Sequence, residues 1–273
     1  MMRPGEGSNP DNRTEYDETS LAGQWTTDPP PRCRLGNLHR GFHVVALATR
    51  LIDSLAPAGA PVPIRIPLLP DECRGFLLAV DRQVVRFETC PPGCFRVKKW
   101  GASGPDHFIT PAGKPRHLFS KPVGSEAWLN REYVPHLAAY AVAIIEHGYS
   151  QRRSSFSLYR KFKGDLILRR AGGSYETDAE FYDSEGGIHL QIEAKASEQQ
   201  TNALARSIEH HGTLSELPTT AVKELEYVLD LAPRYLWVVG PGSLDPPKFV
   251  YAVTLTGTMN ASFTPLDGLP VAP

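Results

Sequence analysis

The chain has 273 residues and a mass of 30.1 kDa, which is long enough to bury a sizeable core in one or two domains. Its formal charge of 29 − 30 = −1 excludes a globally basic surface, so any binding of nucleic acid needs a local patch. An apolar run of about 18 residues is absent from the sequence, which therefore predicts no membrane span.

The N-terminal 35 residues are rich in Gly, Pro, Asn, Asp and Thr, which predicts a disordered leader over residues 1–35. This polar, acidic start does not resemble a signal peptide, so we expect a cytoplasmic protein. Residues 36–120 are expected to form a small α+β region, with a helix over 38–55 and strands near 64–66, 76–80, 84–87 and 95–97. Residues 98–117 are interpreted as a solvated linker in preference to a contact with nucleic acid.

Four cysteines occur in the sequence, at Cys33, Cys73, Cys90 and Cys94. The spacing of Cys90-Pro-Pro-Gly-Cys94 invites comparison with a zinc knuckle, to which His39 and His43 could add ligands. The sequence lacks a second tight pair, however, so we favour ordinary buried or turn cysteines and expect no structural zinc. Without a secretion signal, disulfides are not expected either.

A helix is predicted from Ser125 to Gly148, with Pro135 kinking it or beginning its second half. The segment that follows, residues 149–170, carries seven cations against one acid, a local balance of +6. Such a segment can neutralise phosphates and give a salt-dependent affinity for nucleic acid. The contacts are expected from Arg152, Arg153, Arg160, Lys161 and Lys163. Residues 165–169 are predicted to form a strand.

Residues 175–195 alternate apolar and polar side chains around Gly186-Gly187, which predicts a β-hairpin with its loop at 184–187. Counting back from Asp183 opposite Ile188 places Asp178 opposite Glu193. One face is then apolar, and the other carries Glu176, Asp178, Glu180, Gln191, Glu193 and Lys195. Opposed side chains lie about 5 Å apart at Cβ, so these acids repel one another unless a cation neutralises them. The alternative is an ordinary solvated face of an antiparallel hairpin.

Beyond Lys195, a helix capped by Ser197 is predicted to end near Gly212, and a second helix is predicted over 220–231. A buried strand is expected over 235–239 and another strand over 248–255. The tail, residues 257–273, shows no pattern beyond turn residues.

An Asp on one strand followed by an acid-x-Lys triplet on the next, here Asp178 and Glu193-Ala-Lys195, resembles the PD-(D/E)XK or restriction-endonuclease-like nuclease superfamily. The resemblance covers residues 125–255, and Thr177 stands where the family often has Pro. It implies an α/β restriction-endonuclease-like core over residues 121–256, in the order helix, three strands, helix, strand, after the small α+β region.

The resemblance also implies a metal site of Asp178 and Glu193, with Lys195 orienting or deprotonating a metal-bound water. Mg²⁺ or Mn²⁺ suits such a site, because Mg²⁺ is typically held by one or two carboxylates plus waters. In the superfamily the preceding helix can supply a further acid, for which Glu146 is the better placed candidate and Glu132 the weaker one.

The expected function is therefore metal-dependent hydrolysis of phosphodiester bonds, with DNA as the favoured partner. A first alternative is an inactive module on the same fold that binds nucleic acid or protein. A second is an unrelated α+β protein whose acidic face is simply wet. A homodimer is compatible with each of these expectations.

Overall fold

The computed structural model describes residues 41–56, 66–89, 92–99, 107–109, 116–123, 126–161 and 174–273. They belong to a compact unit that spans residues 32–273. The leader expected over residues 1–35 lies outside the described residues. No helix in the part of the chain described is long and apolar enough to cross a lipid bilayer.

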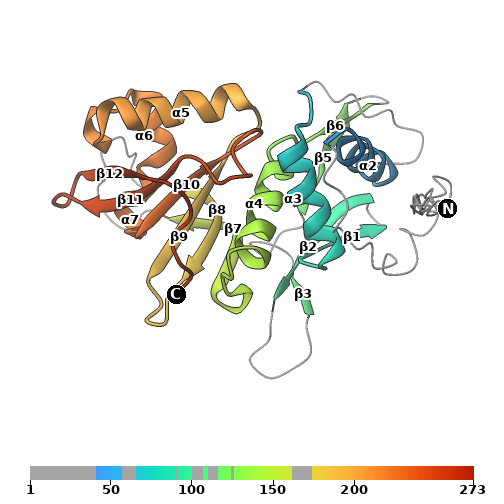
Figure 1. The fold of residues 1–273 in the computed structure, drawn as a ribbon, viewed down its shortest axis with the longest axis horizontal. Coiled ribbons are helices and arrows are strands. Elements are labelled where there is room, and N and C mark those ends of the chain that lie inside the picture. The colour runs from blue at the N-terminus through green and yellow to red at the C-terminus, as the bar shows by residue number, and fades with distance from the viewer. Residues whose placement is uncertain are drawn as a thin grey trace, which may run out of the picture. The chain divides into compact units, whose positions relative to one another are not determined.

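A six-stranded sheet with the order β12-β11-β10-β9-β8-β7 dominates this unit (Figure 1). Its strands are β7 (Ser154–Lys161), β8 (Ser174–Tyr182), β9 (Ile188–Ala194), β10 (Tyr235–Val239), β11 (Val250–Leu255) and β12 (Ala261–Leu266). Strands β9 and β10 are parallel, and the other neighbours are antiparallel. Because a parallel pair needs a long crossover, the chain leaves the sheet after β9 and returns as β10.

Three helices form that crossover and cover one face of the sheet: α5 (Glu198–His211), α6 (Thr219–Leu225) and α7 (Tyr227–Leu231). Their apolar residues share one buried cluster with Leu236 and Val238 of β10. Ser197 caps α5 by accepting a hydrogen bond from the backbone N–H of Gln200 at 3.3 Å, and α5 ends at Gly212 in the left-handed conformation. Both boundaries are as predicted.

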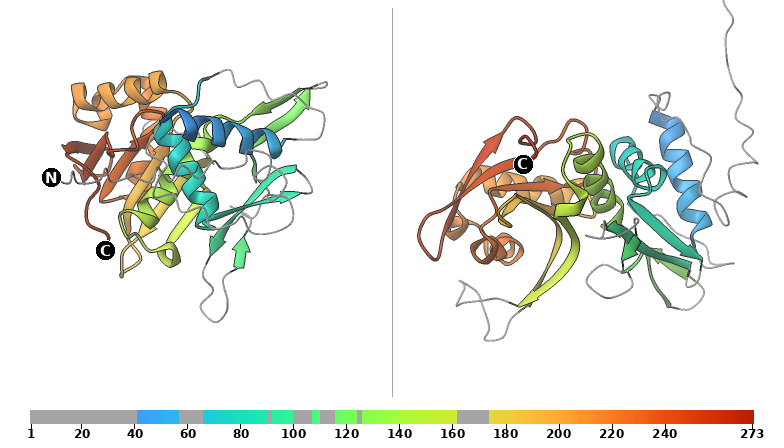
Figure 2. Two further views of the ribbon diagram at one scale, coloured as in Figure 1. Left: turned by 45° about the vertical axis from the view of Figure 1, so that its right-hand side comes forward. Right: turned by 90° about the horizontal axis from the view of Figure 1, so that it is seen from below.

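The opposite face of the sheet packs against α4 (Tyr133–Ile145), which contacts β8, β9 and β10. On its far side α4 packs against α3 (Pro70–Asp81), and α3 in turn against α2 (Gly41–Ser54). The right-hand view of Figure 2 shows these three helices following one another away from the sheet. Gly75 permits the close approach of α3 and α4, because a Cβ there would lie 2.7 Å from the Cβ of Ala138.

Two smaller sheets complete the N-terminal part. One contains β1 (Val85–Thr89), β2 (Pro92–Lys99), β3 (His107–Ile109) and β4 (Arg116–His117), and the other contains β5 (Phe119–Val123) and β6 (Glu126–Leu129). Helices and strands therefore mix here, as expected. The prediction of a linker is wrong for residues 98–99, 107–109 and 116–117, because these residues pair within β2, β3 and β4.

The strand predicted over residues 76–80 is wrong, because these residues lie in the middle of α3. Pro70 stands at the first position of this helix, and Asp71 and Glu72 follow in its first turn. A helix start favours all three residue types at these positions. Those signals outweigh the apolar run that suggested a strand.

The helix predicted from Ser125 begins at Tyr133 instead, because Glu126–Leu129 pair with β5. Pro135 then falls in the first turn of α4, where its missing N–H breaks no helical hydrogen bond. The strand predicted over residues 165–169 lies outside the described residues, and the edge of the main sheet is formed by β7. Residues 261–266, expected to be patternless, form β12 because Ala261 and Phe263 alternate inward against the core.

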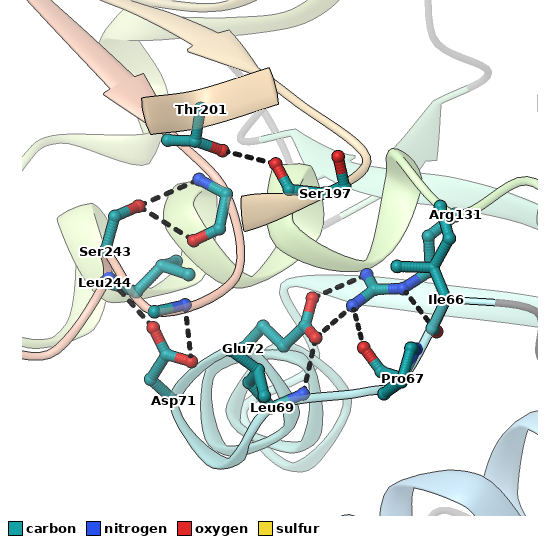
Figure 3. Close-up of polar contacts among 12 residues, drawn as sticks. Ile66, Pro67, Leu69, Asp71, Glu72, Arg131, Ser197, Thr201, Ser243 and Leu244 are labelled. Atoms are coloured by element: carbon teal, nitrogen blue, oxygen red, sulfur yellow. Dashed lines mark hydrogen bonds and ion pairs between the residues drawn. The ribbon is translucent and has the colours of Figure 1, made fainter. Parts of the chain in front are cut away.

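Two acids of α3 tie this helix to the rest of the unit (Figure 3). The carboxylate of Asp71 accepts hydrogen bonds from the backbone N–H groups of Gly242 at 3.1 Å and Leu244 at 3.0 Å. Glu72 is fully buried and forms a two-pronged ion pair with Arg131, in which Nη1 lies 2.5 Å from Oε2. Because Arg131 immediately precedes Glu132, this pair fixes the chain at the start of α4.

The central hairpin has the predicted register near its base. Ala179 pairs with Ile192 and Glu180 with Gln191, so positions 178 and 193 come next along the ladder. The ladder shifts near the loop, where Tyr182 rather than Asp183 pairs with Ile188. The carboxylate of Asp183 instead accepts hydrogen bonds from the loop N–H groups of Glu185 and Gly187, each at 2.9 Å.

The central part of the hairpin's polar face is buried, which corrects the alternative of a wet acidic face. Glu180 and Gln191 are 0% exposed and Glu193 is 9% exposed. The cause is the crossover, because α6 and α7 lie over this face and Tyr227 of α7 reaches Glu193. Acids in this position need partners within the protein or a bound cation.

Candidate active site

A polar pocket of about 280 Å³ lies where β8 begins, β9 ends and α4 starts. Its lining is formed by Arg116, Asn130, Glu132, Tyr133, His136, Glu176, Asp178 and Glu193. Four of these residues are acids and one is an arginine, so the formal charge of the lining is 1 − 4 = −3 with histidine neutral. A pocket of this charge attracts cations.

Asp178 lies at the meeting point of the two hairpin strands. Its Oδ2 accepts a hydrogen bond of 2.6 Å from the backbone N–H of Ala194, and its Oδ1 lies 3.7 Å from Nδ1 of His136. Burial raises the pKa of Asp178 well above its usual value, and the charges of Glu193 and Glu132 raise it further. The three carboxylates therefore repel one another, and a divalent cation among them would relieve that repulsion.

Glu193 is oriented through both of its carboxylate oxygens. The hydroxyl of Tyr227 donates to Oε2 at 2.9 Å, and Nζ of Lys195 donates to Oε1 at 2.7 Å. Burial raises the pKa of the Tyr227 hydroxyl well above its usual value, and the charge of Glu193 adds to the effect, so this group is a neutral donor. Each oxygen of Glu193 keeps a second lone pair that could face a metal.

Lys195 bridges Glu193 and Glu224, whose Oε2 lies 2.8 Å from Nζ. Burial lowers the pKa of Lys195, but the contacts with the two carboxylates outweigh burial, and the pKa is raised above its usual value. The ammonium group is therefore charged at neutral pH. In this state Lys195 can position groups and offset negative charge, and the expectation that it deprotonates a water stays a prediction.

The two candidate acids of α4 lie at opposite ends of the helix. Glu132 lines the pocket, and its pKa is raised first by burial and then by the charge of Glu193. Glu146 follows the last turn and binds Arg74 in two places, with Nη2 at 3.0 Å from Oε2. A helix of 13 residues, about 20 Å long, separates them. Glu146, the better placed candidate in the sequence, is therefore wrong as the further acid, and Glu132, the weaker candidate, is the one that lines the pocket.

The remaining acids of the hairpin's polar face have partners within the protein. Glu176 lies at the pocket, with Oε1 2.5 Å from Nη2 of Arg116. Glu180 accepts hydrogen bonds from Thr177 Oγ1 at 2.7 Å, from Arg160 Nη2 at 2.6 Å and from the hydroxyl of Tyr182. Glu180 thus belongs to a buried structural network and not to the pocket.

Of the basic residues expected to contact nucleic acid, the three whose side chains the structure describes, Arg152, Arg153 and Arg160, are not in the pocket lining. Arg160 pairs with the buried Glu180, and its contact with a phosphate stays a prediction. Arg152 and Arg153 are exposed in a short 3-10 helix that precedes β7. Strand β7 begins opposite Phe181, three residues beyond Asp178 on β8. The start of β7 is therefore about 10 Å from Asp178 along the strand direction. The side chain of Lys161 and the whole of Lys163 lie outside the described residues.

The structure adds four pocket residues that the sequence analysis did not identify, Arg116, Asn130, Tyr133 and His136. Arg116 extends from β4, opposite Phe95, and its side chain is 17% exposed. His136 lies on α4, is 1% exposed and stacks on Phe156 with 3.8 Å between ring centroids. Burial lowers the pKa of His136 to about 3, and its Nε2 has no hydrogen-bond partner among the described residues. An unpartnered, buried polar atom in the lining is itself a sign of a ligand site.

The pocket residues fit a hard divalent cation. No group of three or more His, Cys, Asp or Glu side chains is gathered to hold a metal among the residues that the structure describes. Mg²⁺ requires less, because it keeps several waters and is held by one or two carboxylates plus substrate oxygens. Asp178 and Glu193 offer these carboxylates, and Glu132 offers a third.

The cysteines give no comparable group within the described residues. Cys73 is buried in α3 and Cys94 is buried in β2. Cys33, Cys90 and His39 lie outside the described residues, so the comparison with a zinc knuckle stays untested.

Comparisons of the chain with protein-family models, with curated proteins and with solved structures found no match. The chemistry of the pocket is therefore argued from its own residues.

Proposed function

We propose that residues 121–256 form a restriction-endonuclease-like core and that the protein is a metal-dependent nuclease that hydrolyses phosphodiester bonds in DNA. The order of elements supports this fold: α4, then β7, β8 and β9, then the crossover that begins with α5, then β10. The observation that carries the function is the convergence of Asp178, Glu193 and Glu132 on one pocket, with Lys195 bound to Glu193.

Asp178, Glu193 and Glu132 would hold the cation, which when bound supplies Lewis-acid chemistry at a phosphate. The protein's own contribution is to fix these groups in advance. The N–H of Ala194 orients Asp178, and the hydroxyl of Tyr227 orients Glu193. Lys195 carries its positive charge beside Glu193, where it can position a water or a phosphate oxygen and offset the negative charge that develops during hydrolysis.

The second candidate is the inactive binding module on the same fold. It is favoured by the two ion pairs that engage Lys195 and by the lack of a preassembled metal cluster among the described residues. The module predicts binding of nucleic acid or protein without cleavage, whereas the nuclease predicts binding of DNA and cleavage that requires a metal.

The test is incubation of the full chain with supercoiled plasmid and with linear duplex, in Mg²⁺ or Mn²⁺ and in EDTA. We expect cleavage that EDTA stops and that the double variant Asp178→Asn, Glu193→Gln lacks, because it keeps the shape of the site and removes its charge. Binding without cleavage under every condition would favour the module. Cleavage that survives in the double variant would mean that the activity belongs to another site or to a contaminant.

A further inference from the structure

Among the residues that the structure describes, Arg116 is the positively charged side chain that lines the acidic pocket. It reaches the pocket from β4, a strand of the small N-terminal sheet, whereas the acids come from α4 and the main sheet. The N-terminal part thus contributes a side chain to the site. This side chain is positively charged, whereas the other charged residues of the lining are acids.

The charge of the pocket requires such a group if a phosphate is to enter. Without Arg116 the lining would carry a formal charge of 0 − 4 = −4, so one divalent cation would leave −2. A phosphodiester is itself an anion, and its approach would be opposed without a further positive charge facing the pocket. Arg116 supplies that charge from β4 and brings the total to −1.

The guanidinium of Arg116 has donors to spare. It offers five N–H donors in a planar fork that matches the oxygens of a phosphate. One Nη2 contact of 2.5 Å goes to Glu176, and a further hydrogen bond goes to the hydroxyl of Tyr133. Its Nε is buried and has no hydrogen-bond partner among the described residues. A buried donor without a partner is costly, and a phosphate oxygen would satisfy it.

We propose that Arg116 binds a phosphate of the substrate and that Glu176 holds Arg116 in place until the phosphate arrives. Glu176 is suited to this exchange because its side chain is 38% exposed and can turn to solvent. The inference rests on the proposed function, which it deepens by assigning substrate recognition in the pocket to a residue outside the nuclease-like core.

The test measures binding of a fluorescently labelled DNA duplex by anisotropy, with Ca²⁺ in place of Mg²⁺ and over a series of salt concentrations. We expect Arg116→Gln to weaken binding at least tenfold and to reduce the slope of log affinity against log salt by about 0.9, since one phosphate contact is lost. Arg116→Lys should recover part of the affinity, because it keeps the charge but loses the fork.

The chain offers a matched control in Arg96 of β2, which pairs with Glu88 and belongs to the same small sheet but not to the pocket lining. Arg96→Gln should leave binding unchanged. Glu176→Gln should tighten binding several-fold, because it removes the carboxylate that competes with the phosphate. If Glu176→Gln weakens binding as much as Arg116→Gln does, the pair is only structural and the proposal is wrong.

Thermal melting with Mn²⁺ separates this inference from the proposed function. Arg116→Gln should keep the metal-induced rise in melting temperature, since Arg116 is not a metal ligand, and that rise also shows that the variant is folded. A wild-type protein that binds and cleaves DNA, with an Arg116→Gln variant that does both equally well, overturns this inference alone. A wild-type protein that neither binds nor cleaves DNA overturns both.

Discussion

Glu132 and Glu146 flank the same helix, α4, yet Glu132 lines the pocket with Asp178 and Glu193 while Glu146 is paired with Arg74. Glu132→Gln should lower the apparent affinity for Mg²⁺ in a cleavage assay by about 10–100-fold, as the loss of a supporting group at a metal site usually does. Glu146→Gln should leave the assay unchanged and cost about 0–1 kcal/mol of stability, because it removes a partly exposed ion pair. Equal effects of the two substitutions would contradict the placement of Glu132 at the metal.

Repulsion among the pocket carboxylates predicts that a cation stabilises the folded protein. At a Mn²⁺ concentration 100-fold above the dissociation constant, the free energy of unfolding should rise by about 2.7 kcal/mol. Thermal melting of the wild type with and without Mn²⁺ measures this rise. The double variant Asp178→Asn, Glu193→Gln should melt at the same temperature with and without the metal, and an equal shift in both proteins would mean that Mn²⁺ binds elsewhere.

The charge of Lys195 predicts how its substitutions behave. Lys195→Met should lower kcat by about 10²–10³-fold, the usual loss when one group that stabilises developing charge is removed. Lys195→Arg should keep part of the rate, because a charge can act where a proton acceptor cannot. The matched control is Lys223→Met, a change of an exposed lysine on the neighbouring helix α6. A Lys195→Arg variant as slow as Lys195→Met would indicate instead that Lys195 acts as a base.

Loss of Arg131 should make stability depend on pH through Glu72. Burial raises the pKa of Glu72 and Arg131 opposes the rise, so Arg131→Met should raise the pKa further. A carboxyl with a raised folded pKa binds its proton more tightly in the native state than in the unfolded chain. Its contribution to stability is therefore complete below the unfolded pKa of about 4.3 and is lost as the pH rises through the folded pKa.

We accordingly expect Arg131→Met to be destabilised by about 3–5 kcal/mol at neutral pH, the usual cost of an unpaired buried charge, and by less near pH 4. Denaturant unfolding of the variant and the wild type at both pH values gives the difference. Adding Glu72→Leu should remove the pH dependence of that difference. A penalty that is the same at both pH values would show that packing, not the charge of Glu72, dominates.

The C-terminal half of the fold was largely predictable because its signals are local. The hairpin register follows from alternation around Gly186-Gly187, and the cap at Ser197 and the stop at Gly212 bound α5 within the sequence itself. The starts of α3 and α4 were missed for different reasons. Pro70 and the acids after it are a local signal that the apolar run obscured, whereas β6 forms only because β5 pairs with it.

The candidate site also contains residues that the sequence could predict and residues that it could not. The pair Asp178 and Glu193 could be predicted, because cross-strand neighbours follow from the register of one hairpin. Arg116 and His136 could not, because they reach the pocket through contacts between elements far apart in the sequence, and neither belongs to a spaced motif. The burial of the hairpin's polar face could not be predicted from the sequence either, because it depends on where the crossover helices pack after β9.

The tight contact between Gly75 and Ala138 limits how the chain can be divided for study. A fragment that begins at residue 121 would lack α3, and so would present the buried outer side of α4 to water and favour aggregation. It would also lack Glu72, which fixes the start of α4, and Arg116. The packing of α3 against α4, more than the hairpin motif, therefore determines the shortest fragment that should be assayed for activity.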